Sequence, residues 1–331
     1  MSKLPIKNEY GFFEIRLESI GGLGAHLAGK MLAEAGVLGL GLNGAHFSSY
    51  GSEKKGSPVK SFVRLGEGEL RISSPVERPH IVGVFHEALF KTIDVVNGLY
   101  PDGVILVNTT KSTDEIRKAL KLKSGVVAVI DALNISVEEK TRVNTAMLGA
   151  LYRVAEFLDP EQMKKVILAT FGEKYPQLVE ANIRTFDRGF NEVKFETFEA
   201  EGGNVSEFIR ANPLLGYKTQ PLGGNIIDPG NTIKKDLSGS RQGYIPEFNI
   251  SECISCANCD IVCPDLCFTW EEKEDSKGRP QMFLKGIDYK YCKGCLKCVE
   301  ACPTNALKTI REVEGYTEEH SVSQKFKLAS N

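Results

Sequence analysis

Residues 253–264 read CISCANCDIVCP, and residues 292–303 repeat the same cysteine spacing as CKGCLKCVEACP. Each stretch has the form Cys-x2-Cys-x2-Cys-x3-Cys-Pro. The second copy follows the first at a constant offset of 39 residues, because 292 − 253 and 302 − 263 are equal. This regularity indicates an internal duplication, with a charged insertion from Glu271 to Gln281 between the copies.

The spacing is typical of the ligands of two iron-sulfur cubanes. A cubane needs four thiolates, and one tight turn with three cysteines supplies only three of them. In the bacterial-type ferredoxin motif the fourth ligand comes from the other copy. We therefore expect two 4Fe-4S clusters. The ligands expected for the first cluster are Cys253, Cys256, Cys259 and Cys302. The ligands expected for the second cluster are Cys292, Cys295, Cys298 and Cys263.

Zinc and disulfides are the alternatives for these cysteines. Zinc ribbons use paired Cys-x2-Cys knuckles and do not require a third cysteine or a Cys-Pro ending. A disulfide framework belongs to oxidising compartments, whereas the first ten residues, MSKLPIKNEY, do not resemble a signal peptide. The ninth cysteine, Cys267, is not needed as a ligand, and we expect it to be a small buried side chain near a cluster.

Composition favours a two-domain, soluble, cytoplasmic protein. The chain has 331 residues, and all nine cysteines lie after residue 250. Its 41 basic and 43 acidic residues nearly balance, so neither nucleic acid nor a membrane is an expected partner. Basic residues outnumber acidic ones around the second copy of the motif. Lys293 and Lys297 are therefore candidates for a patch that docks an acidic soluble ferredoxin.

The first two hundred residues alternate β-branched runs with helical patterns, which favours a mostly parallel sheet covered by helices. The expected strands are Phe12–Leu17, Val59–Leu65, His80–Phe85, Val104–Val107 and Val126–Ile130. The expected helices are Ala25–Ala35, Ala88–Leu99, Ser112–Leu120, Asn144–Phe157, Glu161–Thr170 and Tyr175–Val193. Ser112 and Glu115 form a candidate capping box.

We identify no catalytic or nucleotide-binding residue in this chain. The loop Gly21-Gly22-Leu23-Gly24 lies between a strand and a helix, but Leu27 stands where a dinucleotide fingerprint needs Gly or Ala. The five histidines show no metal-binding spacing, and no nucleophile elbow is present. The reaction chemistry is therefore expected on another chain.

Four segments are expected. They are an α/β domain (1–198), a Gly-, Asn- and Pro-rich linker or arm (199–243), a small α+β two-cluster ferredoxin domain (244–313) and a polar C-terminal tail (314–331).

The chain resembles a fusion of the gamma and delta subunits of the 2-oxoacid:ferredoxin oxidoreductases over nearly its whole length. The gamma-like signatures are Gly21–Gly24 with Ala28–Ala35, Ser49–Glu53 with Gly56–Arg64, and Asn144–Ala150, of which the last two are similar to the pyruvate-type branch. The delta-like signatures are Ser240–Pro246 and Gly286–Cys295. Leu23 replaces the usual Gln of the family's Gly-Gly-Gln-Gly loop, so a polar contact made there in relatives is not expected here.

This resemblance implies an electron-transfer subunit. Thiamine diphosphate, Mg²⁺ and a further 4Fe-4S cluster would belong to partner alpha and beta subunits, with soluble ferredoxin as acceptor and a dimer of heterotrimers as the assembly. Pyruvate with coenzyme A and oxalate without it are equally compatible substrates. The alternatives are a self-contained reductase with a nicotinamide or flavin cofactor, and an assembly scaffold without functional clusters.

Overall fold

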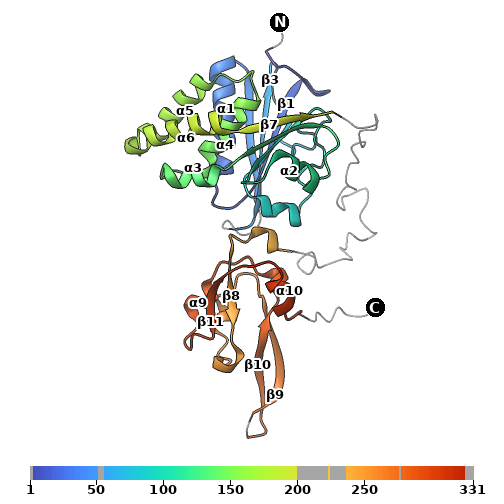
Figure 1. Cartoon of the computed structure of the whole chain (residues 1–331), viewed down its shortest axis with the longest axis vertical. Coiled ribbons are helices and arrows are strands. Elements are labelled where there is room, and N and C mark those ends of the chain that lie inside the picture. Colours follow the sequence, from blue (N-terminus) through green and yellow to red (C-terminus); the bar gives the residue numbers. More distant parts are fainter. Residues whose placement is uncertain (1–2, 51–55, 200–222, 224–235, 276, 325–331) are drawn as a thin grey trace. The chain divides into compact units, whose positions relative to one another are not determined.

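A computed structural model describes residues 3–50, 56–199, 223, 236–275 and 277–324 (Figure 1). The chain divides into two compact units, Met1–Arg210 and Ala211–Asn331. The first is an α/β unit and the second carries small strands and the cysteine turns, so the expected fold class is confirmed. Most of the expected linker, 199–243, lies outside the described residues.

The first unit is built on a seven-stranded sheet with the order β2-β3-β1-β4-β5-β6-β7. Its centre is parallel and consists of β1 (Phe12–Ile20), β4 (Ile81–Val84), β5 (Val104–Asn108) and β6 (Gly125–Ile130). Antiparallel strands extend it on both sides, namely β3 (Pro58–Gly66), β2 (Asn43–Tyr50) and β7 (Lys194–Phe198). Because the central strands are covered on both faces, β4, β5 and β6 consist almost entirely of apolar residues, whereas β1 also carries the buried charged residues Glu14, Arg16 and Glu18.

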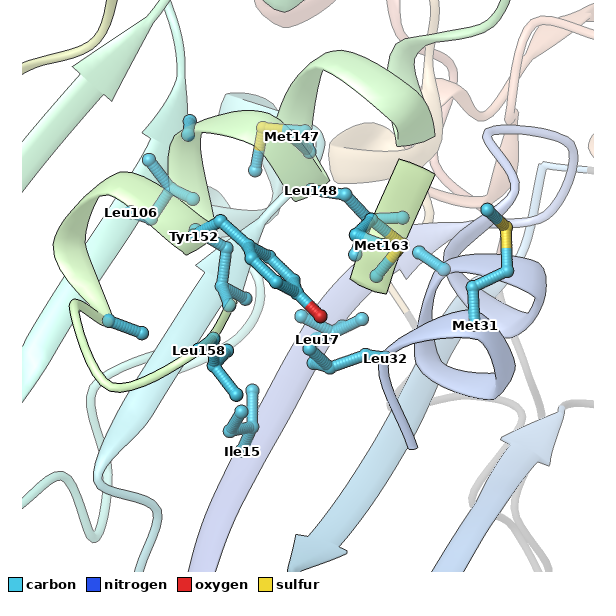
Figure 2. Packing of buried hydrophobic residues seen from close by; sticks show 14 of the residues in the cluster. Ile15, Leu17, Met31, Leu32, Leu106, Met147, Leu148, Tyr152, Leu158 and Met163 are labelled. Atoms are coloured by element: carbon cyan, nitrogen blue, oxygen red, sulfur yellow. The ribbon is translucent and has the colours of Figure 1, made fainter. Parts of the chain in front are cut away.

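Each face of the sheet packs against its own apolar cluster. On β5, Leu106 belongs to one cluster, whereas Ile105 and Val107 belong to the other, as the two-residue period of a strand requires. The larger cluster includes side chains of five helices, α1 (Ala25–Leu40), α3 (Ala132–Glu138), α4 (Val143–Val154), α5 (Pro160–Gly172) and α6 (Val179–Glu192). Figure 2 shows Tyr152 of α4 among its leucines and methionines. The short helices η1 (Glu87–Lys91) and α2 (Thr113–Ala119) contribute to the smaller cluster.

Helices α4 and α6 touch through their backbones. A Cβ atom added to Gly149 of α4 would lie 2.0 Å from the carbonyl oxygen of Phe186, and one added to Gly189 of α6 would lie 2.1 Å from that of Ala146. The hydroxyl of Thr145 donates across this contact to Asn182 at 2.8 Å. The two glycines therefore allow an unusually close helix pair, and they fall within or opposite the Asn144–Ala150 signature.

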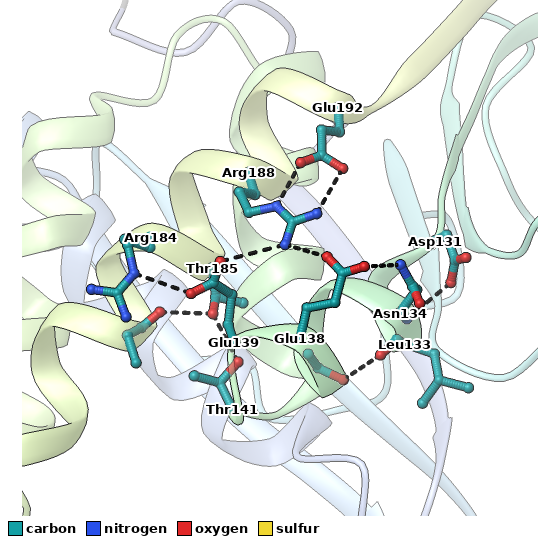
Figure 3. A network of polar contacts seen from close by, with 12 residues as sticks. Asp131, Leu133, Asn134, Glu138, Glu139, Thr141, Arg184, Thr185, Arg188 and Glu192 are labelled. Atoms are coloured by element: carbon teal, nitrogen blue, oxygen red, sulfur yellow. Dashed lines mark hydrogen bonds and ion pairs between the residues drawn. The ribbon is translucent and has the colours of Figure 1, made fainter.

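A polar network fixes α6 to α3 (Ala132–Glu138) on the outside (Figure 3). Arg188 donates to Glu138 at 2.7 Å and to Glu192 at 2.6 Å, and Arg184 donates to Glu139 at 3.1 Å. These groups are largely exposed, so each pair contributes little, and their main effect is to fix the orientation of the helix ends.

Most expected elements are present, and Ser112 and Glu115 form the expected capping box. The helix predicted over Ala88–Leu99 is wrong, because only the single turn η1 forms there. Arg16 on β1 is buried, and its guanidinium takes the carbonyl oxygens of Val95 and Asn97 as acceptors at 3.0 and 2.8 Å. This segment therefore uses its carbonyl groups to satisfy a buried charge.

The second unit contains two small antiparallel ribbons. One pairs β8 (Tyr244–Phe248) with β11 (Leu307–Arg311), and the other pairs β9 (Phe268–Glu274) with β10 (Pro280–Ile287). Between the strands lie η4 (Ile250–Glu252), α8 (Asn258–Ile261), η5 (Tyr289–Tyr291) and α9 (Lys297–Ala301). The turn η3 (Ser238–Ser240) precedes β8, and α10 (Tyr316–His320) follows β11.

The beginning of the expected C-terminal tail packs on this unit. The backbone nitrogen of Val322 donates to the carbonyl oxygen of Ile287 at 2.8 Å, and that of Gln324 donates to the Asp288 carboxylate at 2.9 Å. Among the described residues, no helix is long and apolar enough to cross a membrane.

Candidate metal centre

Two equivalent turns position the cysteines. After η4, Ser255 and Ala257 have φ angles of 53° and 64°, and after η5, Gly294 and Leu296 have φ angles of 70° and 61°. Positive φ is unfavourable for residues other than glycine and persists where the surrounding structure enforces it. Each turn then runs into a short helix, α8 or α9, which carries the third cysteine.

The structure brings the eight cysteines of the two motifs together in two groups of four. One cavity is lined by Cys253, Cys256, Cys259 and Cys302, and the other by Cys263, Cys292, Cys295 and Cys298. These are the groups expected from the sequence. In each group the fourth cysteine comes from the other copy of the motif.

The geometry does not suit a single ion. Within the described part of the chain, no set of three or more His, Cys, Asp or Glu side chains is placed to hold one metal ion. A cubane differs from zinc in that each thiolate binds a separate iron, so its four ligands stand further apart. Both cavities also have apolar walls, with Leu284 and Leu307 at one and Phe268 and Ile287 at the other, and the second cavity adds the ion pair of Lys293 and Asp265. These residues fit a four-iron cluster.

Hydrogen bonds to sulfur distinguish individual cysteines. The backbone nitrogen of Ser255 donates to Cys253 Sγ at 3.4 Å, and that of Cys267 donates to Cys263 Sγ at 3.5 Å. The thiol of Cys267 also bonds to Cys263, and together with backbone amides it lowers the pKa of Cys263 to about 6. Burial dominates at Cys259 and raises the pKa of its thiol to about 12. Metal binding would have to displace that proton.

The structure gives Cys267 and Arg241 contacts at the second cavity that the sequence did not indicate. The expected burial of Cys267 is confirmed, since it is 3% exposed, but it also lines the second cavity, and its backbone nitrogen donates to Cys263 Sγ. Arg241 is 4% exposed and donates from Nε to the carbonyl oxygen of Cys292 at 2.9 Å, and it also donates to the carbonyl oxygen of Tyr289. The spacing of the cysteines in the sequence does not predict these contacts, because they depend on the folded path of the chain.

The docking patch expected at Lys293 and Lys297 needs a correction. Lys293 is 8% exposed and its Nζ lies 3.3 Å from the Asp265 carboxylate, so it cannot present a free charge to a partner. Lys297 is exposed. Lys293 instead belongs to the wall of the second cavity.

The signatures of the first unit meet at the end of β1. The loop Gly21–Gly24 joins β1 to α1, as expected for a strand-to-helix turn. A Cβ atom on Gly24, whose φ is +83°, would lie 3.0 Å from Cγ of Asn144. The backbone nitrogen of Gly21 donates to the carbonyl oxygen of Ser57 at 2.8 Å. Leu23 packs against both apolar clusters, so its side chain has a structural role.

Comparisons with known proteins agree with this architecture. A family model described as pyruvate ferredoxin/flavodoxin oxidoreductase matches residues 14–192, and a model described as a 4Fe-4S dicluster domain matches residues 252–306. The chain belongs to the pyruvate ferredoxin/flavodoxin oxidoreductase family. The family resemblance inferred from the signatures is thereby confirmed, and the second unit is an iron-sulfur domain.

Members of this family with known names match the first part of the architecture. The chain is 41% identical over 194 residues to the pyruvate synthase subunit PorC of Thermotoga maritima, and the aligned region covers 58% of this chain and 98% of that protein. It is 35% identical over 188 residues to the common gamma subunit of pyruvate/ketoisovalerate oxidoreductases of Pyrococcus abyssi, covering 56% and 98%. A crystal structure of the Thermotoga maritima pyruvate oxidoreductase subunit has a TM-score of 0.49 and 36% identity, covering 56% of this chain and 98% of that one.

Proposed function

We propose that the two cysteine groups each bind one 4Fe-4S cluster. The ligands of the first cluster are Cys253, Cys256, Cys259 and Cys302, and those of the second are Cys292, Cys295, Cys298 and Cys263. The observation that carries this proposal is the sorting of these cysteines around two separate cavities, with one ligand exchanged between the copies. The dicluster match over residues 252–306 supports it independently.

The chain is, in this proposal, the electron-transfer subunit of a pyruvate-type 2-oxoacid:ferredoxin oxidoreductase. A 4Fe-4S cluster supplies reversible one-electron storage. The apolar cavity walls exclude water, and the cysteine turns hold the ligand geometry fixed. The described residues offer no catalytic constellation, so the proposal assigns substrate chemistry to partner alpha and beta subunits that hold thiamine diphosphate, Mg²⁺ and a further cluster. Soluble ferredoxin is the proposed acceptor, the cytoplasm the compartment and a dimer of heterotrimers the assembly.

Pyruvate is the substrate that the named relatives support. They are pyruvate and pyruvate/ketoisovalerate enzymes. Oxalate, which stood beside pyruvate on sequence grounds, receives no support from them. A self-contained nicotinamide or flavin reductase receives none either, and Gly24 packs directly against Asn144 where a nucleotide loop would need open space.

Iron analysis tests the ligand assignment. After anaerobic reconstitution of the full chain, we expect about eight iron and eight sulfide ions, from two four-iron clusters. Cys302→Ala should damage the first cluster although it lies in the second motif, and Cys263→Ala should damage the second. The matched control is Cys267→Ala, a neighbouring cysteine that is not a ligand and whose replacement should leave the iron content unchanged. Retention of both intact clusters in Cys302→Ala would overturn the assignment.

Ferredoxin reduction by the anaerobically purified native complex tests the activity. We expect reduction with pyruvate plus coenzyme A and none with oxalate alone. Reduction by oxalate without coenzyme A would replace pyruvate with oxalate in the proposal. Substrate-dependent turnover by the isolated chain would contradict its role as an electron-transfer subunit.

A further inference from the structure

The internal duplication provides a comparison of the two cysteine sites within one chain. At the offset of 39 residues, every ligand of one site has a counterpart in the other. Cys256 and Cys295 correspond, and both are exposed. Solvent access at this corner is therefore similar, and differences between the sites come from the residues around the sulfurs.

A thiol lies beside the second site where the first has a methyl group. Cys267 lines the second cavity, and its counterpart Ala306 lines the first. The Cys267 thiol lies within hydrogen-bonding reach of the sulfurs of Cys263 and Cys292, two proposed ligands of one site, and its backbone nitrogen donates to Cys263 Sγ at 3.5 Å. It is 3% exposed, so these sulfurs are its partners in place of water. A donor aimed at a ligand sulfur stabilises the more negative, reduced state of a cluster.

The two sites also differ in the cationic side chains beside them. Lys293 is 8% exposed in the wall of the second cavity, whereas its counterpart Ile254 is apolar and 60% exposed. Arg241 donates to the carbonyl oxygen of Cys292 and comes from before the duplicated segment, so the duplication supplies no counterpart of it at the first site. Asp265 and Glu312 pair with these two cations and offset part of their effect.

The residue that follows the third cysteine is acidic in the first site and apolar in the second. Asp260 directly follows the ligand Cys259, and its counterpart in the second site is Val299. The indole nitrogen of Trp270 donates to the Asp260 carboxylate at 3.1 Å and holds it in place. A carboxylate close to a ligand sulfur opposes the addition of an electron. Asp260 therefore adds to the effect of Cys267, whereas Asp265, the acid in the wall of the second cavity, is paired with Lys293.

We propose that Cys267, with the buried cations Arg241 and Lys293, gives the cluster of the second site a higher reduction potential than that of the first. This inference rests on the proposed ligand assignment. When the full chain receives one electron, that electron resides at the site of Cys292, Cys295, Cys298 and Cys263. The reduction moves no proton and breaks no bond. Cys267 acts as a positioning and tuning residue and is not a ligand.

An EPR-monitored redox titration of the reconstituted full chain, with dithionite as reductant, tests the proposal. Cys256→Ala and Cys295→Ala, each of which removes one exposed ligand, mark the first and second sites respectively. We expect at least a tenfold preference of the first electron for the second site, which corresponds to about 59 mV for a one-electron couple.

Paired substitutions isolate the thiol. Cys267→Ala makes the second site resemble the first and should lower its potential, whereas Ala306→Cys should raise that of the first. Cys267→Ser keeps a hydrogen-bond donor and should restore most of the difference. Unchanged potentials in Cys267→Ala, or reduction of the first site before the second, would overturn the inference. Failure of iron to assemble in the unmodified chain would instead overturn the ligand assignment on which it rests.

Discussion

Replacement of Gly149 by alanine tests the backbone contact between α4 and α6. The new Cβ would lie 2.0 Å from the carbonyl oxygen of Phe186 and 2.8 Å from the backbone nitrogen of Phe190. Real Cβ contacts essentially never fall under 3.0 Å, so the helices must move apart by about 1 Å at this point. Both obstacles are backbone atoms of a helix, which cannot rotate away as the end of a side chain can.

Three effects set the size of the loss. Alanine is intrinsically better in a helix than glycine by about 1 kcal/mol, which opposes the loss. Overpacking costs about 1 to 3 kcal/mol, and a backbone clash lies at the upper end of that range. Separation also stretches the buried hydrogen bond from Thr145 to Asn182, which contributes about 1 kcal/mol. The free energy of unfolding of the first unit should therefore fall by about 3 kcal/mol.

Anaerobic denaturant unfolding of the full chain, followed by the helical circular dichroism signal, measures this change. Gly172→Ala in α5 is the matched control, because its Cβ would lie 3.6 Å from the Leu168 side chain, an ordinary contact. That variant should be neutral or slightly stabilising, within about 0.5 to 1 kcal/mol. The reasoning is refuted if Gly149→Ala is as stable as the parent chain or changes stability in the same direction as the control.

Three further changes have defined outcomes. Gly24→Ala introduces a side chain at a φ of +83° against a buried neighbour and should lower the free energy of unfolding by about 1 to 3 kcal/mol. Its control, Gly68→Ala, has open space around the new Cβ and should shift the free energy of unfolding by no more than about 0.5 kcal/mol. Equal denaturation midpoints for the two variants would contradict this prediction. Arg64→Met removes the buried partner of Glu14 and should cost about 3 kcal/mol. Burial raises the pKa of Glu14, so the folded state favours the protonated carboxyl group. The stability lost in Arg64→Met should therefore be smaller at about pH 5 than at about pH 8. An equal loss at both pH values would argue against an uncompensated Glu14 carboxylate as its cause. Burial, together with the neighbouring His26 and Lys30, lowers the pKa of His46 to about 4. The folded state therefore prefers the neutral ring, and its stability should fall as the pH is lowered from about 6.5 towards 4. His46→Gln should reduce that loss of stability, which hydrogen exchange of the β2 and β3 amides measures.

The sequence predicted those features that depend on local spacing. The grouping of the cysteines follows from a fixed motif, and the capping box at Ser112 follows from two residues three apart. It could not predict features that depend on partners distant in the chain. The segment 88–99 has a helical pattern, but two of its carbonyl oxygens accept hydrogen bonds from Arg16, more than seventy residues earlier. Strand β7 has no apolar alternation to reveal it, because four of its five residues are exposed.

The same distinction applies to the candidate site. Lys293 was assigned to the surface by its charge alone, and its burial beside Asp265 became visible only in the fold. Cys267 was correctly placed in the interior, but its direction towards two ligand sulfurs depends on the chain path between the copies. Residue types and spacing therefore predict how the cysteines group, whereas the other side chains around each group become visible only in the tertiary structure.

The exchange of one cysteine between the two groups has a consequence for how the protein matures. Cys302 lies with the first group and Cys263 with the second, so neither group is complete until the two copies of the motif have come together. Filling either site with iron orders residues that the other site needs. The first site to be filled therefore bears the loss of chain entropy, and the second site is filled without losing that entropy again. Iron uptake is therefore expected to be cooperative, with fully loaded and empty chains prevailing over chains that carry a single cluster.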